Sequence, residues 1–294
     1  MISRPSLRNL ARAVLCSVSL LIWLIYGCTS STKPTYFTKD IPRHIETIAE
    51  NEYTLTVKAK LVGSTLWIYL PLGDIFVKTD KPERYLERFE ISSNALALKA
   101  GVLKGEYMIK AVPDREKYQE YKLDKAVIDK INDVFKIFRR VLFSMERANN
   151  EVRFLCVVIA DIKNGYQVTQ MFYTNDIKKV SYEFISWGEF QHRSIQETIV
   201  SESIIGDKNG INVGYNDIQM KDFIVGQVLN RIKLKFGKPE VASDADVDKE
   251  VIKIIELTLK MYNFKDFTSV ELYNMLTNRR IVLSPANVWA GQDE

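Results

Sequence analysis

The sequence has few residues of the kinds that bind metals or crosslink small secreted domains. It contains only three Cys (Cys16, Cys28 and Cys156) and two His (His44 and His192). A Cys/His zinc site needs more ligands, and three Cys cannot build the framework of a disulfide-rich domain. A chain of 294 residues buries roughly 75% of its unfolded surface and needs no such crosslinks. We therefore expect no metal and no other cofactor.

Several catalytic signatures are also missing. The chain has no phosphate-binding loop, no dinucleotide-binding glycine pattern, no HExxH and no Gly-x-Ser-x-Gly. His192 lies two residues before Ser194, a spacing at which two side chains on a helix do not face each other. The sequence therefore assigns no catalytic residue.

The positive charge of the chain comes largely from its first residues. Lys and Arg number 41 against 37 Asp and Glu, a formal charge of +4. Residues 1–27 contain Arg4, Arg8 and Arg12 and no acidic residue, so without them 38 basic residues face 37 acidic ones. A near-neutral chain gives no charge-based reason to expect a nucleic-acid partner.

The same N-terminal residues have the order of an export signal. After the three Arg, an uncharged apolar stretch runs from Ala13 to Tyr26. Fourteen helical residues rise about 21 Å, which is short of a hydrocarbon core of roughly 30 Å. The stretch is therefore better explained as the apolar region of a signal peptide than as a membrane span.

The end of this stretch resembles the lipobox of bacterial lipoproteins. Ile25 is aliphatic, Gly27 is small and Cys28 follows; bulky Tyr26 departs from the small residue usual at that position. The resemblance implies that residues 1–27 are removed between Gly27 and Cys28, and that Cys28 carries acyl chains that bind the membrane. The alternative is an uncleaved signal anchor with an incidental Cys.

The resemblance also implies a location outside the cytoplasm. In this family an Asp after the Cys typically retains the protein at the inner membrane of diderm bacteria. This chain has Thr29 there, which favours the outer membrane, facing the periplasm, if the host is diderm.

We expect a fold of the α+β class, with a mainly antiparallel sheet covered by several amphipathic helices. The lipidated Cys28 and a polar tether occupy 28–40, an α+β domain 41–240, and a helical C-terminal subdomain or extension 241–294. Helices are predicted near 42–50, 123–145, 222–236 and 247–262, within 176–200, and after a cap at Thr268. Strands are predicted at 53–61, 65–72, 95–99, 107–112, 154–162 and 166–173, with an Asn164-Gly165 hairpin.

One region has the residue types of a glycan-binding or glycan-cleaving cleft. Glu183 and Glu189 flank an aromatic stretch that includes Trp187, and His192 follows it. Asp161, at the end of a predicted buried strand, is a further carboxylate. Paired carboxylates beside exposed aromatic rings suit glycan chemistry. We treat these five residues as candidates for a cleft.

The leading hypothesis for function is a lipid-anchored envelope protein that binds or scaffolds an envelope protein or cell-wall component without catalysis. The alternative is an envelope hydrolase, with glycan as a candidate substrate, that uses the carboxylates Asp161, Glu183 and Glu189.

Overall fold

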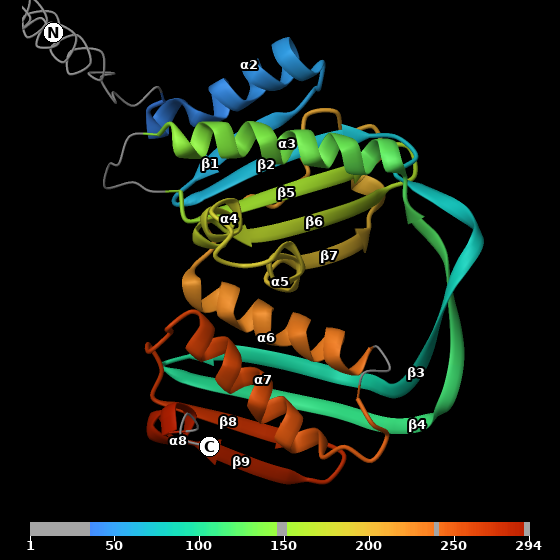
Figure 1. The fold of residues 1–294 in the computed structure, drawn as a ribbon, viewed down its shortest axis with the longest axis vertical. Helices are drawn as coiled ribbons and strands as arrows, with labels where there is room; N and C mark the ends of the chain where they lie inside the picture. The colour runs from blue at the N-terminus through green and yellow to red at the C-terminus, as the bar shows by residue number, and fades with distance from the viewer. Residues whose placement is uncertain (1–35, 146–151, 238–240, 291–294) are drawn as a thin grey trace, which may run out of the picture.

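The chain folds into two β-sheets with helices over and between them (Figure 1). The computed structural model describes residues 36–145, 152–237 and 241–290. The strand order is β1-β2-β5-β6-β7 in the first sheet and β3-β4-β8-β9 in the second. In each sheet one pair is parallel, β2–β5 and β4–β8, and the others are antiparallel. This confirms the expected α+β class, with two sheets where one was expected.

The first sheet holds the most apolar strand of the described chain. All eight residues of β5 are buried, as a central strand covered on both faces requires. The strands of this sheet are β1 (Lys58–Val62), β2 (Thr65–Leu72), β5 (Phe154–Asp161), β6 (Tyr166–Tyr173) and β7 (Ile195–Val200). The short helices α4 (Thr174–Ser181) and α5 (Trp187–His192) connect β6 to β7.

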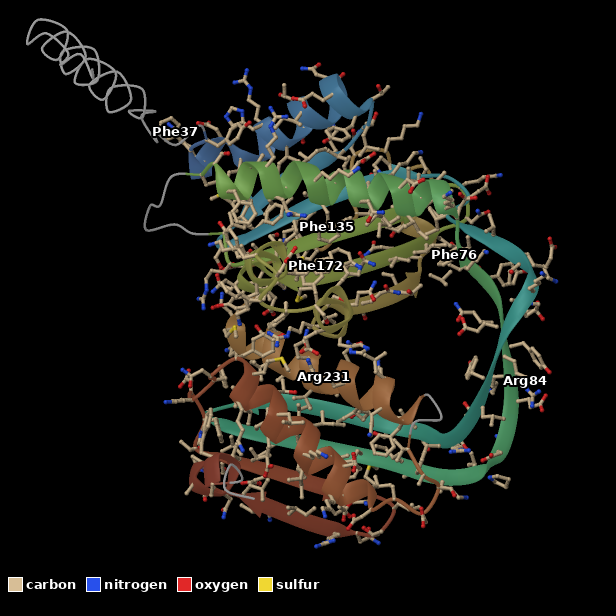
Figure 2. The ribbon with its side chains drawn as sticks, in the orientation of Figure 1. Phe37, Phe76, Arg84, Phe135, Phe172 and Arg231 are labelled. Atoms are coloured by element: carbon tan, nitrogen blue, oxygen red, sulfur yellow. The ribbon has the colours of Figure 1, made fainter. Side chains whose placement is uncertain are left out.

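Two helices cover one face of the first sheet. They are α2 (Ile41–Tyr53), which follows the short 3₁₀ helix η1 (Thr38–Asp40), and α3 (Lys125–Phe143). The Asp124 side chain caps α3 by accepting a hydrogen bond from the N–H of Ala126. Figure 2 shows Phe135 of α3 near Phe172 of β6, and their ring centroids are 4.8 Å apart. The apolar stripe of α3 thus packs on the sheet.

A third long helix, α6 (Met220–Phe236), lies between the two sheets. Phe223 packs in the core under the first sheet, with the loop that contains the 3₁₀ helix η2 (Glu202–Ile204). Ile224, Val228 and Ile232 instead join the core of the second sheet. The helix is therefore covered on two sides.

The second sheet combines segments that are far apart in the sequence. Its strands are β3 (Phe76–Lys99), β4 (Val102–Leu123), β8 (Ser269–Asn274) and β9 (Arg279–Leu283), and the helices α7 (Val247–Met261) and α8 (Pro285–Ala290) pack with it. Buried Asp248 of α7 accepts hydrogen bonds from Tyr107 of β4 and Asn274 of β8, each at 2.6 Å. The C-terminal residues therefore complete a core that begins with residue 89.

Between the two sheets, β3 and β4 form a two-stranded ribbon that bows away from the body (Figure 1). Residues 113–122 of β4 are all exposed, and Figure 2 shows Arg84 on this ribbon. Pro82 and Pro113 fall where the pairing register shifts, at positions that need not donate to the ladder. Cross-strand ion pairs such as Lys117–Glu87 line the ribbon, but exposed pairs stabilise it little.

Most of the predicted elements are confirmed with small changes of boundary. These are the helices α2, α3, α6 and α7, the turn at Gly63 (φ +57°) between β1 and β2, and the buried strand β5 followed by β6. The strand predicted at 53–61 is confirmed only from Lys58 onward, because α2 extends to Tyr53. The predicted strands at 95–99 and 107–112 are confirmed as parts of the longer β3 and β4.

Other predictions were wrong. Residues 195–200, expected to be helical, form β7 along the edge of the first sheet. The helix expected after Thr268 is β8, where Val270 and Leu272 alternate inward in parallel pairing with β4. Residues 241–290 are therefore not a purely helical subdomain. The β5–β6 connection is a four-residue loop in which only Gly165 has a positive φ, not a two-residue Asn164-Gly165 turn.

The ribbon is expected to be the part of the β-structure that opens most easily. An isolated pair of strands has few buried apolar contacts, so its amides should exchange with solvent roughly a hundredfold faster than those of β5. Hydrogen–deuterium exchange on peptides from 80–88 and 113–121 measures this. Equal protection of the ribbon and β5 would contradict it.

Candidate functional site

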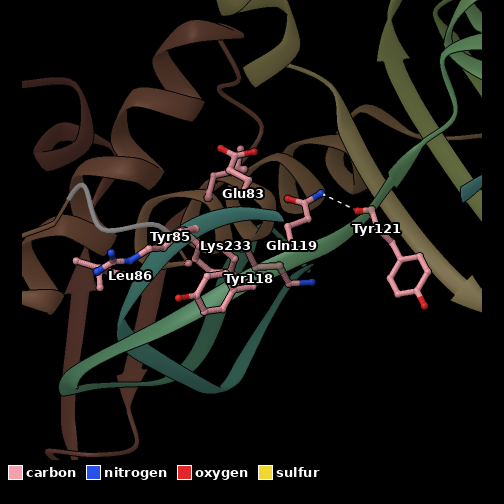
Figure 3. Close-up of a pocket in the computed structure, with 10 residues that line it drawn as sticks. Glu83, Tyr85, Leu86, Tyr118, Gln119, Tyr121 and Lys233 are labelled. Atoms are coloured by element: carbon pink, nitrogen blue, oxygen red, sulfur yellow. Dashed lines mark hydrogen bonds between the residues drawn. The ribbon is translucent and has the colours of Figure 1, made fainter. Parts of the chain in front are cut away.

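A hollow lies on the inner side of the ribbon (Figure 3). Its volume is about 990 Å³, and it opens between the ribbon and the C-terminal end of α6. Tyr85, Tyr118 and Tyr121 contribute from the ribbon, and Lys233 contributes from α6. None of the five residues predicted from the sequence lines this groove.

A smaller hollow of about 360 Å³, the Trp187 pocket, lies where α3 faces α4 and α5. It has a polar wall on α3 and an apolar wall opposite. The polar wall consists of Asp129, Asn132, Asp133, Lys136 and Arg139, and the apolar wall includes Phe135, Ile177, Val180, Trp187 and Phe190. The pocket therefore presents several hydrogen-bonding groups beside an aromatic surface.

The position of Trp187 follows from local sequence. The Ser186 hydroxyl accepts a hydrogen bond from the N–H of Glu189 and caps α5, with Trp187 as the first helical residue. Phe190, one turn later, is buried and stacks on Phe172 of β6 at 5.5 Å. The Trp187 ring lies 5.3 Å from that of Phe190 and stays 52% exposed. The sheet thus supports one side of the indole and leaves the rest open.

An ionic cluster under α5 holds the helix in place. The Arg193 guanidinium donates to Asp176 of α4 at 2.9 Å and to Glu189 at 2.8 Å. Burial alone would lower the pKa of Arg193, but its hydrogen bonds to these carboxylates raise it above the usual value. Gln227 of α6 donates to the Arg193 carbonyl and links α5 to the helix between the sheets. Glu189 is therefore engaged in an ion pair that positions α5.

The structure brings some predicted cleft residues together and not others. Trp187 lines the pocket, and Glu189 lies on the same short helix. Glu183 is exposed after α4, at φ +61°, and His192 is exposed at the end of α5. None of these three polar side chains lines the Trp187 pocket. The predicted carboxylates therefore do not form a pair across this pocket.

Asp161 lies at the far end of the central strand β5. Helix α4 follows Tyr173, which pairs with Phe154 at the start of β5, so Asp161 and the start of α4 are separated by the length of that strand, roughly 23 Å. Its buried carboxylate accepts hydrogen bonds from the backbone N–H groups of Ile75, Lys163 and Asn164 and from the Asn164 side chain. Asp161 thus fixes two loops and does not reach the Trp187 pocket.

The remaining candidates fall elsewhere. Cys156 is fully buried in β5, and burial raises the pKa of its thiol, which makes it unreactive. Within the described residues, no group of three or more His, Cys, Asp or Glu is placed to hold a metal ion. In that same part of the chain, no helix is long and apolar enough to cross a membrane. Gly27 and Cys28 lie outside the described residues.

No family model, curated protein or solved structure matches this chain.

The pocket residues that sequence reasoning missed are those of α3. Asp129, Asn132 and Asp133 have the spacing of neighbours on one helix face, a pattern that is typical of a solvated helix surface. Asp133 accepts a hydrogen bond from Lys136 at 2.8 Å. Only the position of α5 beside this face turns it into a pocket wall. The arrangement can bind a small polar ligand with one apolar face.

We expect Asp161→Asn to destabilise the protein by about 2 kcal/mol at pH 7, because the new amide NH₂ cannot accept the hydrogen bonds. Burial raises the pKa of Asp161, but hydrogen bonds from Asn164 and the backbone lower it below the ordinary value overall. The carboxylate therefore adds stability above about pH 4, which is lost as pH falls through the folded-state pKa.

Urea unfolding of the wild type and Asp161→Asn at pH 7 and pH 3 measures the difference. We expect the gap in unfolding free energy to shrink at pH 3. The exposed Asp80→Asn is the control and should change little. A gap that is constant with pH would contradict the assignment.

Proposed function

We propose that this chain is a lipid-anchored, extracytoplasmic protein that binds a component of the cell envelope without catalysis. The observation that carries the proposal is the order of three Arg, an uncharged apolar stretch, Gly27 and Cys28. The described domain starts at Tyr36, eight residues after Cys28. In a diderm host, Thr29 supports the outer membrane as the site of attachment.

We propose the Trp187 pocket as the binding site. An exposed indole packs against the C–H face of a sugar ring, while carboxylate, amide and guanidinium groups bond to its hydroxyls. Asp129, Asn132 and Arg139 supply such groups opposite Trp187. A volume of about 360 Å³ lies within the range of small-molecule pockets. Cell-wall glycan is the envelope component that this chemistry fits best.

The alternative is a glycan hydrolase, and one observation favours it. Asp129 and Asp133 are two carboxylates in a pocket with an exposed indole. Both project from one helix, however, and hydrolysis requires carboxylates that flank the scissile bond. Asp133 is also ion-paired with Lys136. Binding without cleavage is therefore the stronger proposal.

The anchor has a direct test. Cys28→Ala should abolish metabolic labelling with an acyl precursor and release the protein from membranes or leave an uncleaved precursor. Mass spectrometry of the N-terminal peptide and membrane fractionation measure both effects. Unchanged acyl labelling in the variant would refute the lipid anchor, and Cys156→Ala serves as the matched control.

The pocket has its own test in sedimentation with purified peptidoglycan. Trp187→Ala should weaken binding of the lipidated full-length protein about tenfold, or roughly 1.4 kcal/mol, because the aromatic surface is lost. The control is Trp289→Ala on α8, outside the pocket. Equal binding by the two variants would contradict the site, and release of sugar fragments that Asp129→Asn stops would favour the hydrolase.

A further inference from the structure

A second exposed aromatic surface lies at the end of the molecule where the tether joins the domain. The Tyr36 N–H donates to the Ser144 carbonyl, and Tyr36 forms a β-bridge with Met145. The chain from Cys28 therefore enters the domain beside the C-terminal end of α3. Figure 2 shows Phe37 at this point, and its side chain is 51% exposed.

Aromatic side chains continue from this entry point onto the segment after α4. Phe143, the last residue of α3, is 41% exposed and contacts Tyr182 with ring centroids 5.3 Å apart. Tyr182 is 62% exposed and lies 6.3 Å from Phe184, which is 77% exposed. Phe37, Phe143, Tyr182 and Phe184 are named the tether-end patch.

Basic side chains surround the tether-end patch. Lys39 and Arg153 are exposed, and the Arg153 carbonyl accepts a hydrogen bond from the N–H of Thr174 at the start of α4. Lys178 and Lys179 line a hollow together with Tyr182 and Phe184. Among the residues that the structure describes here, the acidic side chains are Asp40, Glu183 and Asp176, of which Asp176 is buried and paired with Arg193 and Lys179. The exposed charge is therefore mainly positive.

The length of the tether limits the distance between this end of the domain and the membrane. Eight residues from Cys28 to Tyr36 span at most about 28 Å. With acyl chains on Cys28, the entry point and the patch beside it stay within that distance of the bilayer. Burial of Tyr and Phe rings at the boundary between head groups and acyl chains lowers the free energy of the bound protein. Lys and Arg are attracted to anionic head groups.

We propose that the tether-end patch lies against the head-group region of the bilayer that holds the acyl chains of Cys28. The inference rests on the proposed lipid anchor and adds an orientation to it. The acyl chains attach the protein to the membrane, and the patch keeps the tether end of the domain in contact with the head groups.

The test places a fluorescent probe on the patch of the full-length, lipidated protein. Phe184→Cys is labelled with an environment-sensitive nitrobenzoxadiazole dye in vesicles of phosphatidylethanolamine and phosphatidylglycerol. Cys28 is blocked by acylation and Cys156 is fully buried, so the new thiol reacts selectively. The control is Tyr118→Cys on the ribbon, an aromatic site that is 55% exposed, against 77% for Phe184.

We expect the emission of the probe at position 184 to shift to the blue. Nitroxide lipids should quench it roughly threefold more strongly than the probe at position 118, because interfacial side chains sit about 5–10 Å into the head-group boundary. Flotation of the vesicles and the mass of the N-terminal peptide, taken on the same sample, report the anchor separately.

The outcomes distinguish the two proposals. Protein that is acylated and floats, but whose probe at position 184 stays as exposed as that at position 118, overturns the orientation and leaves the anchor standing. A blue shift without lipid quenching points to a protein covering the patch, and also overturns it. Protein that is neither acylated nor bound to vesicles overturns both proposals.

Discussion

The burial of α6 on two sides is the constraint on which the rest of the fold depends. Phe223 packs against Phe154 under the first sheet, while Ile224 and Val228 pack into the second core. A helix that is apolar on opposite faces cannot rest on a surface, so each sheet must cover one side. At Gly226 the helix passes close to β7, since a Cβ there would lie 2.8 Å from Cδ1 of Ile195. The helix is thus the shared layer of both cores.

This shared layer explains the unusual length of β3 and β4. The chain leaves the core of the first sheet at Phe76 and returns to that core at Leu123. These two residues pair with each other, and between them the chain must travel past α6 and back. An extended pair of strands covers that distance while keeping its backbone groups hydrogen-bonded. The middle of the ribbon has no sheet beside it and stays exposed. The groove on its inner side follows from that path.

Local patterns predicted the elements whose burial is visible in their own residues. The apolar stripe of α3 predicts a helix with one buried face, and the apolar run of β5 predicts a strand that is buried on both faces. Gly63 marks the turn between β1 and β2. Strand β7 is an exposed edge with polar residues such as Glu197, so only pairing with β6 makes it a strand. In β8, Thr268 and Glu271 have the spacing of a helix cap, but parallel pairing with β4 prevails.

The same reasoning explains what was found of the candidate site. Trp187 is a candidate from the sequence because it lies in an aromatic stretch flanked by carboxylates, but only the structure shows that its indole is exposed. Its partners on α3 are not candidates from the sequence, because Asp129 and Asp133 look like a solvated helix face until α5 packs beside them. The sequence cannot distinguish a carboxylate that binds a ligand from one that has a partner within the protein. Glu189 pairs with Arg193, and Asp161 accepts hydrogen bonds from backbone N–H groups.

A lipid anchor alone confines a domain to a membrane without orienting it, since a polar tether lets it rotate. An orientation requires a second contact with the membrane. A contact next to the tether entry loses the least conformational entropy, because the anchor already confines that end of the domain. The patch at Phe143 and Tyr182 meets this condition. The ribbon bows out from the opposite side of the molecule (Figure 1). In the proposed orientation the ribbon lies on the side of the molecule that is remote from the bilayer.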